Sequence, residues 1–112
     1  MTTKLNVWRG SGNVFADLGL PDAEELLVKA NLMHRLSQSI QRLALTQREV
    51  GRRLGIDQPK VSALLNGRLA NFSSERLMRL LTALGQDIEI VVKSKRRGQE
   101  RGRIRVVEQA HA

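Results

Sequence analysis

The 112-residue chain contains no cysteine and no tyrosine, and aromatic residues make up only 3% of it. The absence of cysteine excludes disulfide bonds and thiolate metal sites. With only two histidines, His34 among apolar neighbours and His111 near the end, we expect no metal site. A core so poor in aromatic residues must be built from leucine, isoleucine and valine, which favours a small helical domain.

The sequence also lacks long apolar segments and recognisable groups of catalytic residues. No run approaches the roughly 18 residues of a membrane span, and the start of the chain, MTTKLNVWRGSG, lacks the apolar core of a signal peptide. We therefore expect a cytoplasmic protein without a membrane partner. There is no glycine-rich phosphate loop after a strand, and adjacent Glu24 and Glu25 would point to different sides of a helix. Neither enzymatic activity nor a cofactor is expected.

Positive charge is what the chain has in excess, with a formal net charge of +8 at pH 7. Residues 46–72 contain five basic and two acidic side chains, and residues 93–112 contain seven and two. Residues 73–92, by contrast, have a net charge of −1, from two basic and three acidic side chains. Because the charge is concentrated in two segments, it indicates a polyanionic partner rather than solubility alone.

Residues 46–67, TQREVGRRLGIDQPKVSALLNG, have the pattern of two short helices joined by a tight turn. Thr46 and Glu49 have the spacing of a capping box at the start of the first helix. Gly55 suits the left-handed residue that ends this helix. The apolar residues Val50, Leu54 and Ile56 are expected to face inward.

The second helix of this pattern starts after Asp57, a suitable N-cap, and tolerates Pro59 in its first turn. Gly67 supplies its stop. Its inward positions are predicted to be Val61, Leu64 and Leu65, and its outer positions Gln58, Lys60, Ser62 and Ala63. Two such helices make a helix-turn-helix, whose second helix fits the major groove of DNA.

The remaining chain supports this unit, and we expect three segments. These are a partly ordered arm over residues 1–20, a helical domain over residues 21–86, and a strand with a basic tail over residues 87–112. The arm includes apolar Val7 and Trp8, which would pack on their own domain or on a partner protein. A long helix is predicted to start at Pro21 and Asp22, with its apolar side formed by Leu26, Val28, Leu32, Met33, Leu36, Ile40 and Leu43. A later helix, capped by Ser73 or Ser74, would bury Leu77, Leu80, Leu81 and Leu84.

Residues 87–93 are rich in β-branched side chains and predict a strand. A lone strand is not stable in water, so it must pair. It could form a hairpin with residues 103–108, or join the same strand of a second copy through Ile88, Ile90 and Val92. The second arrangement gives a two-fold homodimer with two recognition helices for a palindromic operator. The basic run at residues 93–103 is either a solvated linker or a tail that contacts phosphates.

The helix-turn-helix stretch resembles the Xre/Cro-like family of phage-repressor-type proteins, and the resemblance covers roughly residues 30 to 92. The matching residues are Thr46-Gln47, Gly55, Gln58-Pro59-x-Val61-Ser62, Asn66-Gly67-Arg68, Phe72-Ser73-x-Glu75-Arg76-Leu77 and Leu84-Gly85. The chain departs from the family at Val50-Gly51, where Leu-Ala is common, and at Leu65, where an acidic residue is frequent. With the segment from Gly12 to Gly19 and the predicted strand, the pattern is closest to Xre-type antitoxins of toxin–antitoxin pairs. That resemblance implies a phage-repressor-like helical bundle and a possible toxin partner.

Two sets of residues are expected at double-stranded DNA. Base edges would be read by Gln58, Lys60, Ser62 and Ala63 at the start of the second helix. Phosphates would be bound by Gln47, Arg48, Arg52, Asn66 and Arg68. The resemblance implies that Gln47 both binds a phosphate and braces the second helix.

The sequence therefore predicts a sequence-specific DNA-binding repressor, and the resemblance suggests an antitoxin that regulates its own operon. The alternative is a protein-interaction module that uses the same scaffold without DNA. The two differ in their response to salt, because only DNA binding should weaken steeply as salt rises.

Overall fold

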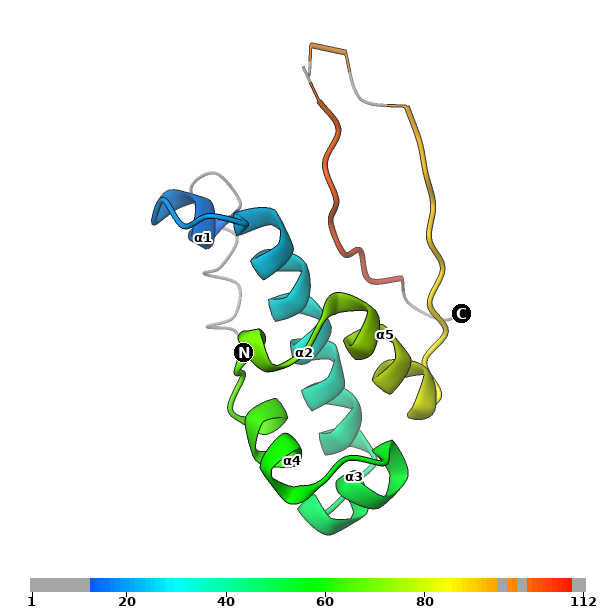
Figure 1. Cartoon of the computed structure of the whole chain (residues 1–112). Coiled ribbons are helices and arrows are strands. Elements are labelled where there is room, and N and C mark those ends of the chain that lie inside the picture. Colours follow the sequence, from blue (N-terminus) through cyan, green and yellow to red (C-terminus); the bar gives the residue numbers. More distant parts are fainter. Residues whose placement is uncertain (1–12, 95–96, 99–100, 110–112) are drawn as a thin grey trace. The chain divides into compact units, whose positions relative to one another are not determined.

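The computed structural model describes residues 13–94, 97–98 and 101–109 (Figure 1). The helices are α1 (Val14–Asp17), α2 (Ala23–Arg42), α3 (Gln47–Leu54), α4 (Gln58–Leu65) and α5 (Ser74–Ala83), with a 3-10 turn η2 (Leu69–Asn71) between α4 and α5. The chain divides into two compact units. One comprises residues 29–91, and the other comprises the described residues on either side of it.

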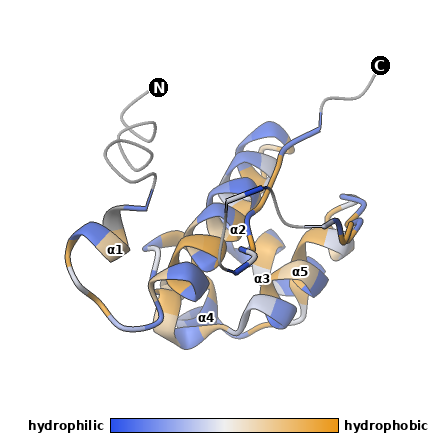
Figure 2. Cartoon of the chain, turned by 90° about the horizontal axis from the view of Figure 1, so that it is seen from above, coloured by the Kyte–Doolittle hydropathy of each residue, from blue (hydrophilic) through white to orange (hydrophobic). Residues whose placement is uncertain are grey.

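The unit of residues 29–91 is a bundle of four helices with a leucine-rich core. One residue from each helix is completely buried: Leu36 of α2, Val50 of α3, Val61 of α4 and Leu77 of α5. Figure 2 shows hydrophobic and hydrophilic residues on opposite sides of these helices. The predicted inner faces are confirmed for Leu80, Leu81 and Leu84, for Leu32, Met33 and Ile40, and for Ile56 in the turn.

The start and end of α3 are set by the residues predicted to do so. Thr46 Oγ1 accepts a hydrogen bond from the Glu49 backbone N–H at 3.2 Å, and Glu49 Oε1 accepts one from the Thr46 N–H at 2.8 Å. This capping box satisfies two donors that have no partner inside the helix. Gly55 ends α3 with φ +67°, a left-handed conformation that costs glycine little. The local signals of this helix are therefore confirmed.

The close approach of α3 to the turn after it depends on Gly51. A Cβ atom at this position would lie 3.0 Å from the Ile56 carbonyl oxygen and 3.4 Å from Val61 Cγ2. A glycine inside a helix costs about 1 kcal/mol relative to alanine. The packing of α3 on the turn and on α4 explains why a glycine is tolerated inside this helix.

Helix α2 is shorter than the sequence pattern predicts at both ends. It begins at Ala23 because Asp22 has a left-handed backbone, with φ +57°. It ends at Arg42, and Ala44 adopts φ +54° in the turn that follows. Leu43 lies beyond the helix and is 41% exposed, so its predicted place on the apolar side was wrong.

The second unit contains α1, a single turn inside the predicted arm. Asn13 Oδ1 caps it by accepting hydrogen bonds from the N–H groups of Phe15, at 2.9 Å, and Ala16, at 3.2 Å. Asn13 Nδ2 also donates to the Ala23 carbonyl oxygen at 3.1 Å. Helical structure was not expected here, because one turn is too short to show periodicity. Val7 and Trp8 of the arm lie outside the described residues.

The hairpin predicted between residues 87–93 and 103–108 is absent from the described part of the chain, and pairing of the first segment with a second copy remains a prediction. Residues 87–93 and 103–108 form neither a strand nor a ladder, and the whole described part of the chain contains no strand. The apolar side chains of the first segment are open to solvent, with Ile90 76% and Val92 91% exposed. The Ile104 N–H donates instead to Glu24 Oε2 at 2.8 Å. Without a neighbouring strand, residues with high β propensity do not form a sheet.

Candidate nucleic-acid interface

The two helices of the helix-turn-helix are linked by a hydrogen bond between their first residues. Gln58 Nε2, at the start of α4, donates to Gln47 Oε1, at the start of α3, with a distance of 2.8 Å. Both residues are exposed. The brace that the family resemblance implied between Gln47 and the second helix is therefore confirmed. A phosphate contact of Gln47 remains a prediction.

The N-terminal end of α4 is fixed by Asp57 and presents polar side chains. Asp57 Oδ1 accepts a hydrogen bond from the Lys60 N–H at 3.0 Å. Pro59 lies in the first turn, where the N–H donor that proline lacks would have no acceptor inside the helix. Gln58 and Ser62, one turn apart, are both exposed. These two side chains lie on the same face of the helix and are open to solvent.

Ala63 does not lie on the outer face of α4. Its exposed fraction is 5%, so the expectation that it faces outward was wrong. The reason is tertiary: α4 contacts η2 as well as α3, which covers more of the helix than its apolar pattern indicates. A methyl group this buried has no access to a thymine methyl, and we do not keep Ala63 among the base readers.

Lys60 is half-buried, and its ammonium group is engaged within the protein. The Nζ atom donates to the Asn71 carbonyl oxygen at 3.3 Å and lies 5.3 Å from the centroid of the Phe72 ring. Sequence reasoning assigned no role to Asn71 or Phe72. The only signal for them is that an aromatic residue follows a loop after the recognition helix, and such a signal does not identify a cation partner.

The end of α4 carries a second polar group. Asn66 Nδ2 donates to the Ser62 carbonyl oxygen at 2.9 Å and to Ser62 Oγ at 3.2 Å. Because Ser62 Oγ accepts this bond, its own O–H remains available to donate. Gly67, with φ +69°, follows Asn66 and directs the chain away from the helix.

The basic residues predicted to bind phosphates lie on the surface of the same unit. Arg48 and Arg52, spaced four residues apart on α3, are exposed, as is Arg68 after α4. Spacing of this kind places two cations on one side of a helix. Backbone and side-chain hydrogen bonds with Thr46 hold the pKa of Glu49 below its ordinary value, and the charges of Arg52 and Arg53 add to the effect. Glu49 is therefore ionised at neutral pH and engaged in its cap.

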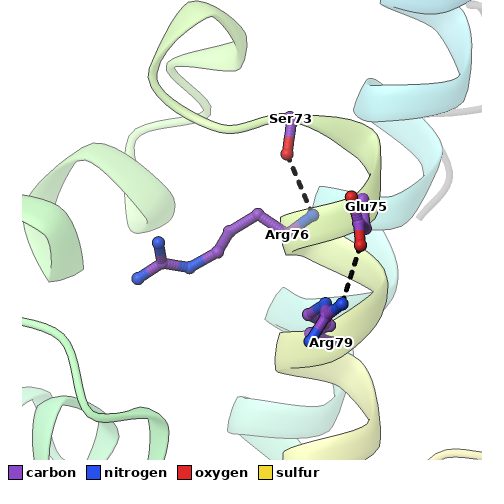
Figure 3. Close-up of polar contacts among 4 residues, drawn as sticks. All are labelled: Ser73, Glu75, Arg76 and Arg79. Carbon is purple, nitrogen blue, oxygen red and sulfur yellow. Dashed lines mark hydrogen bonds and ion pairs between the residues drawn. The ribbon is translucent and has the colours of Figure 1, made fainter.

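Two arginines of α5 differ in their local contacts (Figure 3). Arg79 forms an ion pair with Glu75 one turn earlier, with 2.7 Å between Nη2 and Oε2. Arg76 has its backbone N–H bonded to Ser73 Oγ at 3.0 Å, and its guanidinium extends away from the helix. Ser73, rather than Ser74, is therefore the N-cap.

The described residues contain no group of three or more His, Asp or Glu side chains that could hold a metal ion. Across the same part of the chain, no helix combines the length and the hydropathy needed to cross a bilayer.

Comparison with known proteins agrees with this geometry. Residues 14–93 match the sequence profile of a family described as a helix-turn-helix domain. A solved structure, described provisionally as an XRE family transcriptional regulator, shares 52% sequence identity with the chain and superposes with a TM-score of 0.75. The match covers 80% of this chain and 100% of that one. A search of curated proteins finds no match. The chain belongs to the Xre-like helix-turn-helix family, whose members are DNA-binding regulators of transcription.

Proposed function

We propose that the chain is a sequence-specific transcriptional repressor that places α4 in the major groove of its operator. The observation that carries this proposal is the Gln47–Gln58 hydrogen bond, which holds the polar start of α4 in a defined orientation. A glutamine side chain can pair with adenine through two hydrogen bonds, and a serine hydroxyl can donate or accept. Gln58 and Ser62 are therefore the proposed base readers.

Phosphate contacts would fix the register of the protein on the duplex. Gln47, Arg48, Arg52, Asn66 and Arg68 are proposed for this role, and all five are exposed. They belong to the segment of residues 46–72, which has a net charge of +3 from five basic and two acidic side chains. Each phosphate that such residues neutralise releases counterions, so binding should weaken as salt rises.

The binding experiment measures the affinity for DNA upstream of the gene by fluorescence anisotropy over a range of salt concentrations, with footprinting to locate the site. We expect protection of a short sequence and a steep fall in affinity with salt. Gln58→Ala should reduce affinity most at operators with the original base. Lack of protection, together with binding of a protein partner that salt does not weaken, would favour the alternative of an interaction module.

A homodimer would supply two copies of α4 to a palindromic operator. The proposed contact is the segment with Ile88, Ile90 and Val92, whose side chains are exposed and whose backbone groups form no ladder with any other described segment. Pairing with the same segment of a second copy would cover the apolar side chains and satisfy these groups. The half-site spacing would then be about one helical turn or a multiple of it.

Sedimentation tests this dimer with a matched pair of variants. Ile90→Asp places a charge in the proposed contact, and we expect it to yield monomers. Val107→Asp changes a β-branched residue of similar exposure, 68% against 76%, outside the contact, and should leave the dimer intact. A wild-type chain that is monomeric at high concentration, or two variants with the same behaviour, would contradict the arrangement.

We further propose that the regulator is the antitoxin of a toxin–antitoxin operon that it represses itself. Support comes from the resemblance to Xre-type antitoxins and from the exposed apolar residues Leu18 and Leu20 beside α1. Co-purification of the product of the neighbouring reading frame, and relief of its toxicity on co-expression, test this role. Failure of both would leave a plain repressor.

A further inference from the structure

Lys60 lies on the recognition helix, yet its ammonium group is directed to the segment that follows the helix. It donates to the Asn71 carbonyl oxygen at 3.3 Å, and it lies 5.3 Å from the centroid of the buried Phe72 ring. A cation within about 6 Å of an aromatic ring is attracted by the negative face of the ring. Two different groups therefore attract the same charge away from the outer face of α4.

The 3-10 turn η2 receives a second ammonium group from another helix. Lys29 Nζ of α2 donates to the Leu69 carbonyl oxygen at 3.4 Å. Leu69 and Asn71 are the first and last residues of η2, so its two ends are bound by lysines from α2 and α4. The Leu69 carbonyl oxygen also accepts a hydrogen bond from the Phe72 N–H at 3.4 Å. The lysines therefore add donors to the carbonyl groups at both ends of this short turn and connect it to both helices.

We propose that Lys60 is a positioning residue, which fixes the start of α4 against η2 and Phe72 and does not read bases. Its charge, in this role, sets the angle at which Gln58 and Ser62 are presented. The part of this inference that concerns operator selection rests on the proposed function. The contact itself concerns the free protein and can be tested without DNA.

The chemistry of the contact distinguishes lysine from its closest replacements. Methionine keeps the unbranched apolar stem but has no charge and no donor, so Lys60→Met removes both interactions. Arginine can donate to a carbonyl oxygen and stack on an aromatic ring. Lys60→Arg should therefore preserve the position of the helix.

The DNA experiment compares affinities over a panel of operators with single base changes, at several salt concentrations. We expect Lys60→Met to weaken binding to every operator by the same factor, on the order of two- to fivefold. The ranking of operators should not change, and Lys60→Arg should restore the affinity. The slope of log affinity against log salt should stay at the wild-type value, whereas Arg52→Met, a proposed phosphate contact, should reduce it by about one.

The free-protein experiment uses nuclear magnetic resonance. The ring of Phe72 should shift the ε-methylene protons of Lys60 upfield from their position in an unstructured peptide. Arg79→Met serves as a control that removes an exposed charge on α5 and leaves the Lys60 signal unchanged.

Two results would overturn the proposal: a Lys60 signal at its random-coil position, or a Lys60→Met variant that changes the preference for one base pair. Failure of the wild-type protein to bind DNA, with an upfield Lys60 signal, would instead reject the proposed function and leave the contact with Phe72 standing.

Discussion

Gln58 donates a hydrogen bond to Gln47 across 2.8 Å, so the first side chain of the second motif helix is oriented by the first side chain of the preceding one. The two residues share one hydrogen bond, yet substitution of each should change the DNA affinity in a different way. Gln58 is proposed to contact a base, whereas Gln47 is proposed to contact a phosphate.

Replacing each glutamine by alanine separates these roles. Gln58→Ala should lose about 1–3 kcal/mol of binding free energy at the operator with the preferred base and little at a variant of that base. Gln47→Ala should weaken binding to all operators, because a phosphate contact carries no sequence information. It should also reduce part of the discrimination at the Gln58 base, because the bond that orients Gln58 is lost. Affinities over a panel of single-base operator variants provide the measurement. A uniform loss with Gln58→Ala would contradict its reading role.

Gly51→Ala should destabilise the protein although alanine is the better helix former. The propensity gain is about 1 kcal/mol, but the added Cβ would lie 3.0 Å from a backbone oxygen of Ile56, which cannot rotate away. Overpacking of this kind costs about 1–3 kcal/mol, so we expect a net loss near 1 kcal/mol in urea unfolding. Arg53→Ala, at an exposed position of the same helix, is the control for propensity and should be close to neutral. If Gly51→Ala were instead more stable than wild type, the backbone at Ile56 must be able to shift and make room for the added Cβ.

Ala44→Gly should stabilise the protein. Ala44 has φ +54°, a left-handed conformation that costs a residue with a Cβ about 1–2 kcal/mol. Glycine removes this cost but loses more conformational entropy on folding, which leaves a gain of about 0.5–1 kcal/mol. Thermal unfolding measures it. Ala30→Gly, within α2, should instead destabilise by a similar amount, and a loss with both variants would mean that Ala44 carries no strain.

Glu49 should make the stability of the protein depend on pH. Its pKa is lowered in the folded protein, first by hydrogen bonding with Thr46 and then by Arg52 and Arg53. A lowered folded-state pKa means that the ionised form stabilises the fold, so this contribution is present above the ordinary glutamate pKa. It is lost as the pH falls through the lower, folded-state pKa.

Glu49→Gln isolates this contribution, because glutamine can still complete a capping box but does not ionise. Wild-type protein should be more stable than the variant at neutral pH, and the difference should vanish in acid. Unfolding curves measured from neutral to acidic pH provide the test. Thr46→Ala keeps the backbone N–H that donates to Glu49, so in that background the difference at neutral pH should shrink only in part. A difference that persists in acid would contradict ionisation of Glu49 as its cause.

The features predicted correctly are those whose causes lie within a few residues. The capping box of Thr46 and Glu49, the left-handed Gly55 and the cap formed by Asp57 depend on local hydrogen bonds and backbone sterics. Such signals are visible in the sequence, because the donor and its acceptor are three or four positions apart. The buried leucines of α5 follow from helical periodicity for the same reason.

The errors arise where a distant segment decides the environment. Ala63 was placed on an outer face but is buried in the helix that contacts both α3 and η2. Lys60 is half-buried, and its contacts with Asn71 and Phe72 come from residues more than ten positions away. The strand at residues 87–93 was inferred from β propensity, which describes a side chain's fit to a sheet and cannot supply the neighbouring strand. The left-handed backbones of Asp22, before α2, and Ala44, after it, make the helix shorter than its sequence pattern predicts. Neither residue type is sufficient to predict this conformation.

The recognition helix has only eight residues, and Val61, Ala63 and Leu64 are committed to the interior. In the proposed complex, one copy of the protein can therefore contact only a few base pairs, and each contributes about 1–3 kcal/mol of discrimination. A genome contains on the order of a million or more competing sites. Contacts with so few base pairs do not provide enough discrimination against all of them. For the proposed repressor, most of the selectivity would then come from repetition of the half-site or from the flexibility of the intervening DNA, and natural operators should tolerate many changes outside a short core.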